Sequence, residues 1–69
     1  MTNPAVSPAR QLDNEKEAAA YLKLSPRTLQ AWRLRGGGPE YVKLGNAVRY
    51  DRAALDRYIS ERTRRNSAG

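Results

Sequence analysis

Arg27 and Gln30 lie three positions apart in a segment with the signals of a helix, and each side chain can form two hydrogen bonds at once. An arginine can donate to O6 and N7 of guanine, and a glutamine can pair with N6 and N7 of adenine. Ser25, Thr28 and Ala31 lie beside them. Residues of this kind read base edges in the major groove, although they also occur on ordinary solvated helices.

Cationic side chains flank this segment and continue beyond it. Arg33 and Arg35 lie at the edges of its outward face, where an arginine meets phosphates, which position a protein without specifying a sequence. Lys43, Asn46 and Arg49 follow in a segment with the pattern of a β-hairpin. These three could straddle phosphates or enter the minor groove. Alternatively, a basic hairpin face could serve only to prevent pairing between exposed strand edges.

Other kinds of chemistry lack the residues they need. The sequence has neither cysteine nor histidine, which excludes disulfides, thiolate zinc sites and the usual general base at neutral pH. Gly36-Gly37-Gly38 is not a phosphate cradle, because no strand precedes it and no Lys-Ser/Thr follows. The carboxylates suit helix caps and surface ion pairs better than acid–base catalysis. We therefore expect no enzyme, and no metal, cofactor or small-molecule ligand.

The aromatic side chains could suggest stacking on single-stranded bases. Trp32, however, shares a helical face with Leu29, and Tyr50 and Tyr58 fall on apolar faces of their segments. This pattern favours packing in the core.

The charge distribution indicates a polyanionic partner. Lysine and arginine total 13 against 7 acidic residues, a net charge of +6, and the pI is about 10.3. Between Lys23 and Arg49 the cations are opposed by Glu40 alone, while the other acids lie toward the two ends. A small domain with a pI above about 9 has the charge of a nucleic-acid binder. The plainer alternative is a soluble basic protein.

Two helices separated by a tight corner are predicted first. Asn14 can cap a helix with Glu17 in a capping box, and this helix ends near Lys23. Ser25 caps the next helix, with Pro26 at its first position and a glycine after its end. The inward residues are Ala18, Ala19 and Leu22 on the first helix and Leu29 and Trp32 on the second.

A hairpin and a last helix are predicted next. Two short alternating runs, 41–44 and 48–50, flank Gly45-Asn46-Ala47. A three-residue loop would pair Leu44 with Val48 and Val42 with Tyr50 on one apolar face. Lys43 and Arg49 would then lie opposite each other, which is unfavourable unless an anion sits on them. The last helix begins at Asp51 as N-cap and carries an apolar stripe of Leu55, Tyr58 and Ile59.

The chain length allows one domain. We predict a disordered arm over residues 1–11, a folded domain over 12–62 and a basic flexible tail over 63–69. The amino-terminal residues contain no apolar run, so neither a signal peptide nor a membrane anchor is expected. These features predict a cytoplasmic protein that makes no contact with a membrane.

The ordered motifs resemble the excisionase and AlpA-type branch of the MerR-like helix-turn-helix domains, from about Leu12 to Arg62. The matching segments are Lys16-Glu17-Ala18-Ala19-Ala20-Tyr21-Leu22, Leu24-Ser25-Pro26-Arg27-Thr28-Leu29 with Trp32, Gly38-Pro39, Val42-Lys43-Leu44-Gly45, Val48-Arg49-Tyr50 and Leu55-Asp56-Arg57-Tyr58-Ile59. The resemblance implies a mainly α fold with a small β-hairpin, the winged helix-turn-helix. It also implies double-stranded DNA as ligand, with Arg27, Thr28, Gln30 and Ala31 reading bases and Arg49 on the wing.

The sequence departs from the family pattern at two positions. Lys23 stands where the family often has glycine, so the corner is expected to be tight or strained. Ala31 stands where the family often has a longer polar residue, which would reduce base readout there.

The biological role favoured by the resemblance is a recombination directionality factor, an excisionase that assists a tyrosine integrase on a mobile element of bacterial or phage origin. The runner-up is a small transcriptional regulator with the same binding surface. From another class, the chain could be a protein-interaction module or an RNA binder. We further expect a monomer in solution that binds DNA cooperatively, through head-to-tail contacts, and is associated with the nucleoid when bound.

Overall fold

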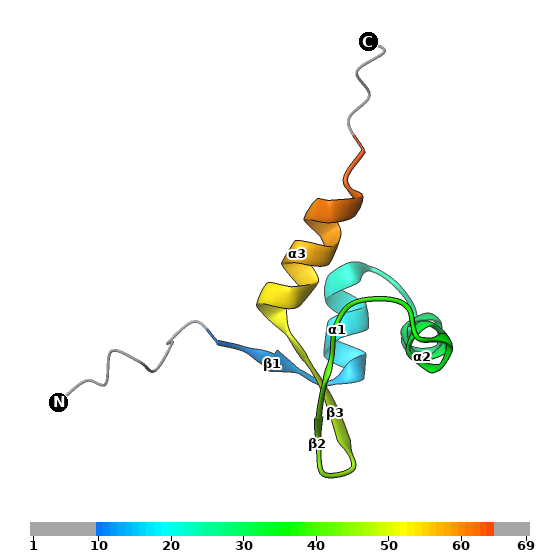
Figure 1. Ribbon diagram of the computed structural model, residues 1–69, viewed down its shortest axis with the longest axis vertical. Helices are drawn as coiled ribbons and strands as arrows, with labels where there is room; N and C mark the ends of the chain where they lie inside the picture. Colours follow the sequence, from blue (N-terminus) through cyan, green and yellow to red (C-terminus); the bar gives the residue numbers. More distant parts are fainter. Residues whose placement is uncertain (1–9, 65–69) are drawn as a thin grey trace, which may run out of the picture.

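The computed structural model of the protein describes residues 10–64. Its elements follow the order β1, α1, α2, β2, β3 and α3 (Figure 1). Their bounds are Leu12–Asp13, Glu15–Leu22, Pro26–Arg35, Val42–Leu44, Ala47–Asp51 and Arg52–Arg62. In Figure 1, α2 is seen almost end-on to one side of α1, β1 lies to the other side, and the β2–β3 hairpin projects away from α3. The predicted fold class, a mainly helical winged helix-turn-helix, is confirmed.

The first helix, α1, has the predicted capping box at its start and a tight corner at its end. Asn14 accepts a hydrogen bond from the Glu17 N–H at 2.7 Å, and the Glu17 carboxylate accepts one from the Asn14 N–H at 2.9 Å. Lys23 ends α1 with φ 60° and ψ 38°, and is the one non-glycine residue with positive φ among residues 10–64. A side chain costs free energy in this left-handed conformation, so the expected strain at the corner is present.

The hairpin register differs from the prediction. Val42 pairs with Arg49, Lys43 with Val48, and Leu44 with Ala47, around a two-residue Gly45-Asn46 turn. Gly45 has φ 64°, and glycine at the first central position is typical of a two-residue turn whose twist matches the strands. The predicted three-residue loop is therefore wrong, and Lys43 and Arg49 lie on opposite faces of the hairpin.

The predicted register assumes that the apolar residues of both strands share one face of the hairpin. This assumption fails because both faces are covered at the base of the hairpin. Tyr50 is buried and Val48 packs on the core on one face. On the other face, Val42 lines a small cavity with Ala54 and Arg57 of α3. Apolar residues are consequently needed on both sides of the strands, so the hydrophobic pattern does not set the register.

The sheet contains a third strand that the sequence pattern did not predict. β1 pairs with β3 in antiparallel register, Leu12 with Asp51 and Asp13 with Tyr50, so the strand order is β1-β3-β2. The Gln11 carbonyl also accepts a hydrogen bond from the Arg52 N–H at 2.8 Å, and Arg10 forms an ion pair with Asp51 at 3.1 Å. Two residues assigned to the predicted arm thus contact the domain. Residues 1–9 of that arm and 65–69 of the predicted tail lie outside the described residues.

The core lies where α1, α2, β3 and α3 meet. Its buried members are Ala18, Ala19, Leu29, Tyr50 and Leu55, with Leu22, Trp32 and Val48 packed against them. Trp32 lies against Tyr58 with ring centroids 5.9 Å apart, so both aromatic rings take the predicted packing role. The predicted stripe of α3 is wrong at its end, because Ile59 is exposed and Ala54 is buried instead.

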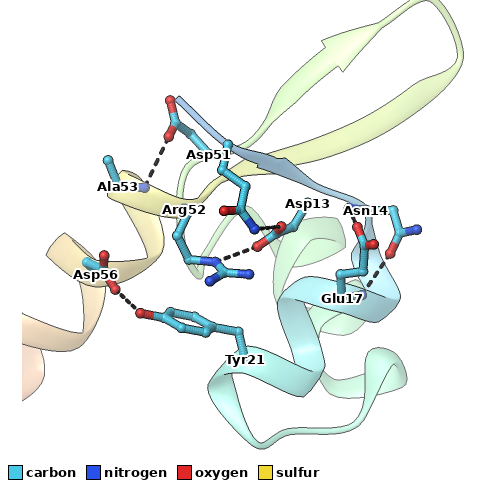
Figure 2. Close-up of polar contacts among 9 residues, drawn as sticks. Asp13, Asn14, Glu17, Tyr21, Asp51, Arg52, Ala53 and Asp56 are labelled. Atoms are coloured by element: carbon cyan, nitrogen blue, oxygen red, sulfur yellow. Dashed lines mark hydrogen bonds and ion pairs between the residues drawn. The ribbon is translucent and has the colours of Figure 1, made fainter. Parts of the chain in front are cut away.

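An ion pair between the half-buried Arg52 and the buried Asp13 ties β1 to the start of α3. Asp13 is only 2% exposed, and it accepts hydrogen bonds from Arg52 Nε at 2.7 Å and from Gln11 Nε2 at 3.0 Å (Figure 2). The Arg52 guanidinium also lies 3.8 Å from the ring centre of Tyr21, whose hydroxyl donates to Asp56. We name these five residues, Gln11, Asp13, Tyr21, Arg52 and Asp56, the polar clamp.

The contacts within the polar clamp raise the pKa of two of its members. The hydrogen bond to Asp56 raises the pKa of the Tyr21 hydroxyl, and the hydrogen bond to Asp13 raises the pKa of Arg52. Arg52 begins α3, where the positive end of the helix disfavours a cation. Asp13 supplies the compensating charge, so the strand and the helix start depend on each other.

Candidate nucleic-acid interface

One stripe of α2 faces away from the core. At about 100° per residue, Arg27, Gln30, Ala31 and Leu34 share one side of the helix. Arg27 and Gln30 are exposed, Ala31 is half-buried and Leu34 is exposed. The two predicted base-reading side chains therefore lie one turn apart at the start of the helix, on the side opposite Leu29.

Ser25 and Thr28 are engaged with each other at the amino-terminal end of α2. The Thr28 N–H donates to Ser25 Oγ at 3.1 Å, and the two hydroxyl oxygens are 2.9 Å apart. Ser25 is exposed and Thr28 is half-buried. Their first role is to cap the helix, which fixes the position of Arg27 beside them.

The two arginines that flank the stripe differ. Arg33 forms an ion pair with Glu15 of α1 at 3.3 Å, lies 5.8 Å from the ring centre of Tyr41, and has a side chain only 14% exposed. Arg35 is exposed and has no ion-pair partner among residues 10–64. The structure thus leaves Arg35 open to a ligand and ties Arg33 to α1.

The hairpin and α2 enclose a groove. Its volume is about 330 Å³, and it is lined by Arg33, Leu34, Tyr41, Lys43, Asn46 and Val48. Lys43 and Asn46 are exposed there, so the groove brings two of the three predicted wing residues beside α2. Arg49 lies on the other face of the hairpin, is half-buried, and donates to the Val48 carbonyl at 2.8 Å.

We name the exposed side chains of this surface the cationic face: Arg27, Gln30, Leu34, Arg35, Lys43 and Asn46. Its charge follows from how the acidic residues are used. All seven carboxylates of the sequence have partners elsewhere. Five form ion pairs with arginines, Glu17 closes the capping box and Asp56 accepts from Tyr21.

The cations left without a carboxylate partner show where the surplus charge lies. Among residues 10–64 they are Lys16, Lys23, Arg27, Arg35, Lys43, Arg49 and Arg64. All but Lys16 and Arg64 lie on the corner before α2, on α2 or on the hairpin. The surplus positive charge of the described residues therefore lies mainly around α2 and the hairpin, whereas Arg33 is paired with Glu15.

Residues 10–64 contain no group of three or more acidic side chains that could hold a metal ion. No helix in this range is long and apolar enough to cross a membrane.

Two capped helices joined by a tight corner, with a basic hairpin beside the second helix, define a helix-turn-helix DNA-binding domain. The chain belongs to the Helix-turn-helix domain family, whose model matches residues 15–63. No curated protein shows significant similarity to the chain. The family match begins at the start of α1, so β1 and its buried Asp13 lie outside it.

Sequence reasoning missed two parts of the surface. Helical periodicity places Leu34 on the outward side of α2, but a leucine carries no hydrogen-bonding signal, so the sequence does not mark it as a binding residue. The groove itself depends on the hairpin register, which the hydrophobic pattern did not fix.

Proposed function

We propose that the protein binds specific sequences of double-stranded DNA, with the start of α2 in the major groove and the hairpin as a wing on the adjacent backbone. The observation that carries this proposal is the separation of charge. Every carboxylate has a partner elsewhere, and five of the seven unpaired cations among residues 10–64 lie on α2, on the hairpin or at the corner before α2. A surface left positive in this way suits the phosphate backbone of a duplex.

Within this surface, Arg27 and Gln30 are the base-reading residues, with Ser25, Thr28 and Ala31 beside them. Arg35 and Lys43 contact phosphates, and Asn46 and Arg49 extend the contact along the wing. Arg33 supports the surface from behind through Glu15 rather than by free contact with the backbone. This division follows from exposure and from the chemistry of each side chain.

The direct test is a salt titration of binding to a labelled duplex chosen by the protein from a random pool, beside a scrambled duplex and an RNA hairpin. A groove reader binds the chosen duplex more tightly at every salt concentration, and its affinity falls steeply as salt rises. Tightest binding to the RNA hairpin would contradict the proposal and favour an RNA binder. Equal affinity for all three probes with a flat salt dependence would contradict it and favour a protein-interaction module.

The biological role we propose is that of an excisionase, a recombination directionality factor that assists a tyrosine integrase. The resemblance of the ordered motifs supports this role. Footprinting on DNA flanking the gene separates it from the runner-up, a small transcriptional regulator. Protected sites at a recombination junction support an excisionase, and sites confined to a promoter support a regulator.

We also propose that several copies act together on DNA. A single module of this size buries only about 600–1,000 Å² of protein surface on a duplex, which limits its affinity. No helix among the described residues carries a heptad seam for a dimer. Head-to-tail contacts between neighbours on the duplex would supply the rest. Sedimentation without DNA should show a monomer, and binding to tandem sites should be tighter than binding to a single site. A stable dimer in the absence of DNA, or equal affinity for tandem and single sites, would contradict the proposal.

A further inference from the structure

Leu34 is the most exposed large hydrophobic residue among residues 10–64. Its exposed fraction is 77%, against 53% for Leu44, the next highest. It lies in the last turn of α2, on the same stripe as Arg27, Gln30 and Ala31. Placing a leucine in water on the most cationic side of the domain contributes nothing to the core, so its role must be sought in what covers this surface.

The surroundings of Leu34 favour one kind of occupant. It lines the groove between α2 and the hairpin together with Lys43 and Asn46, and Arg35 follows it directly. No unpaired carboxylate lies among the described residues of this surface. Charge complementarity therefore favours a polyanion with an apolar group at the depth of the α2 stripe. In the major groove of a duplex, that group is the 5-methyl of thymine.

We propose that Leu34 is a specificity-determining residue that contacts a thymine 5-methyl group, with the Ala31 methyl beside it. This inference rests on the proposed function, since it requires α2 in the major groove. Leu34 lies seven positions after Arg27, a rise of about 10 Å along the helix. For a helix that runs along the major groove, this length corresponds to about three base-pair steps. The thymine read by Leu34 thus lies about three base pairs from the pair read by Arg27.

The test uses a duplex selected from a random pool by the wild-type protein and then synthesised with deoxyuridine in place of thymidine at one position at a time. The exchange removes only the methyl group. Binding by fluorescence anisotropy is compared for the wild type, Leu34→Ala and Leu44→Ala. Leu44 is the matched control, because it is also an exposed leucine but lies outside the α2 stripe. It is on the face of the hairpin that does not carry Lys43.

The wild type should bind one or two of the uracil duplexes about fourfold more weakly, the fold-change that corresponds to about 0.8 kcal/mol for one methyl-sized group. Leu34→Ala should bind the thymine and uracil duplexes equally and keep the thermal midpoint of the wild type. Leu44→Ala should retain the fourfold difference.

Two results would overturn the inference while leaving the proposed function intact. One is a wild-type protein that selects a defined duplex but is indifferent to every thymine-to-uracil exchange. The other is a Leu34→Ala variant that still discriminates. A wild-type protein that selects no consensus and prefers no duplex would instead overturn the proposed function, and this inference with it.

Discussion

The polar clamp and the cationic face use the same kind of side chain in opposite ways. In the clamp, Arg52 is held by Asp13 at 2.7 Å and covers the ring of Tyr21 (Figure 2). On the cationic face, Arg27, Arg35 and Lys43 are exposed and have no carboxylate partner among residues 10–64. A paired arginine fixes one element against another, whereas an unpaired one leaves its hydrogen bonds for a ligand.

This difference teaches how a thin domain separates stability from binding. The acidic residues are paired with groups outside the cationic face, so this face keeps its positive charge. Substitutions on the two sides should consequently have different readouts. Those in the core or clamp should change the thermal midpoint, and those on the cationic face should change only affinity for DNA.

The largest effect is expected at Trp32. Trp32→Ala removes a ring that packs on the core and on Tyr58, a loss of about 3–5 kcal/mol in a domain with little reserve. Circular dichroism should show an unfolded or nearly unfolded chain at 25 °C. A well-folded variant that had lost only DNA binding would place Trp32 on the binding side and break the comparison.

A smaller loss is expected at the clamp. Asp13→Asn removes the charge that compensates Arg52 at the start of α3 while keeping the shape of the side chain. The thermal midpoint should fall by several degrees, with affinity for DNA unchanged at temperatures where the variant is folded. Glu61→Gln is the matched control, because its exposed pair with the adjacent Arg62 should contribute little. Equal midpoints for Asp13→Asn and the wild type would show that the clamp does not stabilise the fold.

On the cationic face, the expected effects are on binding. Arg27→Ala should weaken binding to the selected duplex by about 1–3 kcal/mol and relax the preference at one base pair. Lys43→Ala should weaken binding to every duplex alike and reduce the salt dependence. Both variants should melt as the wild type does. Equal losses on specific and random DNA from both variants would remove the distinction between base reading and phosphate contact.

Most of the fold was predictable because local signals set it. The caps at Asn14, Ser25 and Asp51 act within a few residues, so α1, α2 and α3 begin where the sequence indicates. The positions of Leu29 and Trp32 follow from helical periodicity in the same way.

What could not be predicted depends on contacts between distant segments. β1 has only two residues, and its pairing with β3 joins positions far apart in the chain, which no local pattern reveals. The hairpin register depends on α3 covering Val42, and the ion pair of Arg33 depends on Glu15 lying across from it. Helical spacing places Arg33 at the edge of the outward face of α2, but spacing does not show which arginines already have a carboxylate partner.

A modest gain in stability is expected at Tyr50, the buried residue on the core side of β3. It is 1% exposed, and its hydroxyl has no hydrogen-bond partner among the described residues. Tyr50→Phe should therefore stabilise the fold by about 1 kcal/mol at neutral pH, because an unsatisfied buried hydroxyl is unfavourable. Tyr21→Phe is the opposite case, since it removes the bond to Asp56, and it should destabilise the fold. Chemical denaturation should show a higher free energy of unfolding for Tyr50→Phe than for the wild type, and a lower one for Tyr21→Phe.

The same residue predicts a dependence on alkaline pH. Burial raises the pKa of Tyr50, so the folded state holds this proton more tightly than the unfolded chain, whose tyrosine pKa is about 10. The part of the free energy of unfolding that depends on this proton is fully present below about pH 10. It is lost as the pH rises through the raised pKa of Tyr50 in the folded state. Tyr50→Phe should lose less stability in this range than the wild type. Part of the loss should remain, because the bond to Asp56 also raises the pKa of Tyr21.

The smallest effect is expected at Lys23, where the two sides of the molecule meet. Its φ of 60° is strained for a side chain, yet its charge belongs to the unpaired cations beside α2. Lys23→Gly should relieve the strain and stabilise the fold by about 0.5–1 kcal/mol, a net value because glycine also loses more conformational freedom on folding. It should also remove one phosphate contact and make the salt dependence slightly less steep. Lys23→Ala separates the strain from the charge, because alanine removes the charge but keeps a side chain in the left-handed conformation. It should weaken binding as Lys23→Gly does. It should not raise the thermal midpoint. If Lys23→Gly stabilised the fold and left the salt dependence unchanged, the surface that contacts DNA would end before the corner and would not include Lys23. If neither variant changed the midpoint, the left-handed conformation would cost the fold nothing at this position, and the charge alone would account for the lysine.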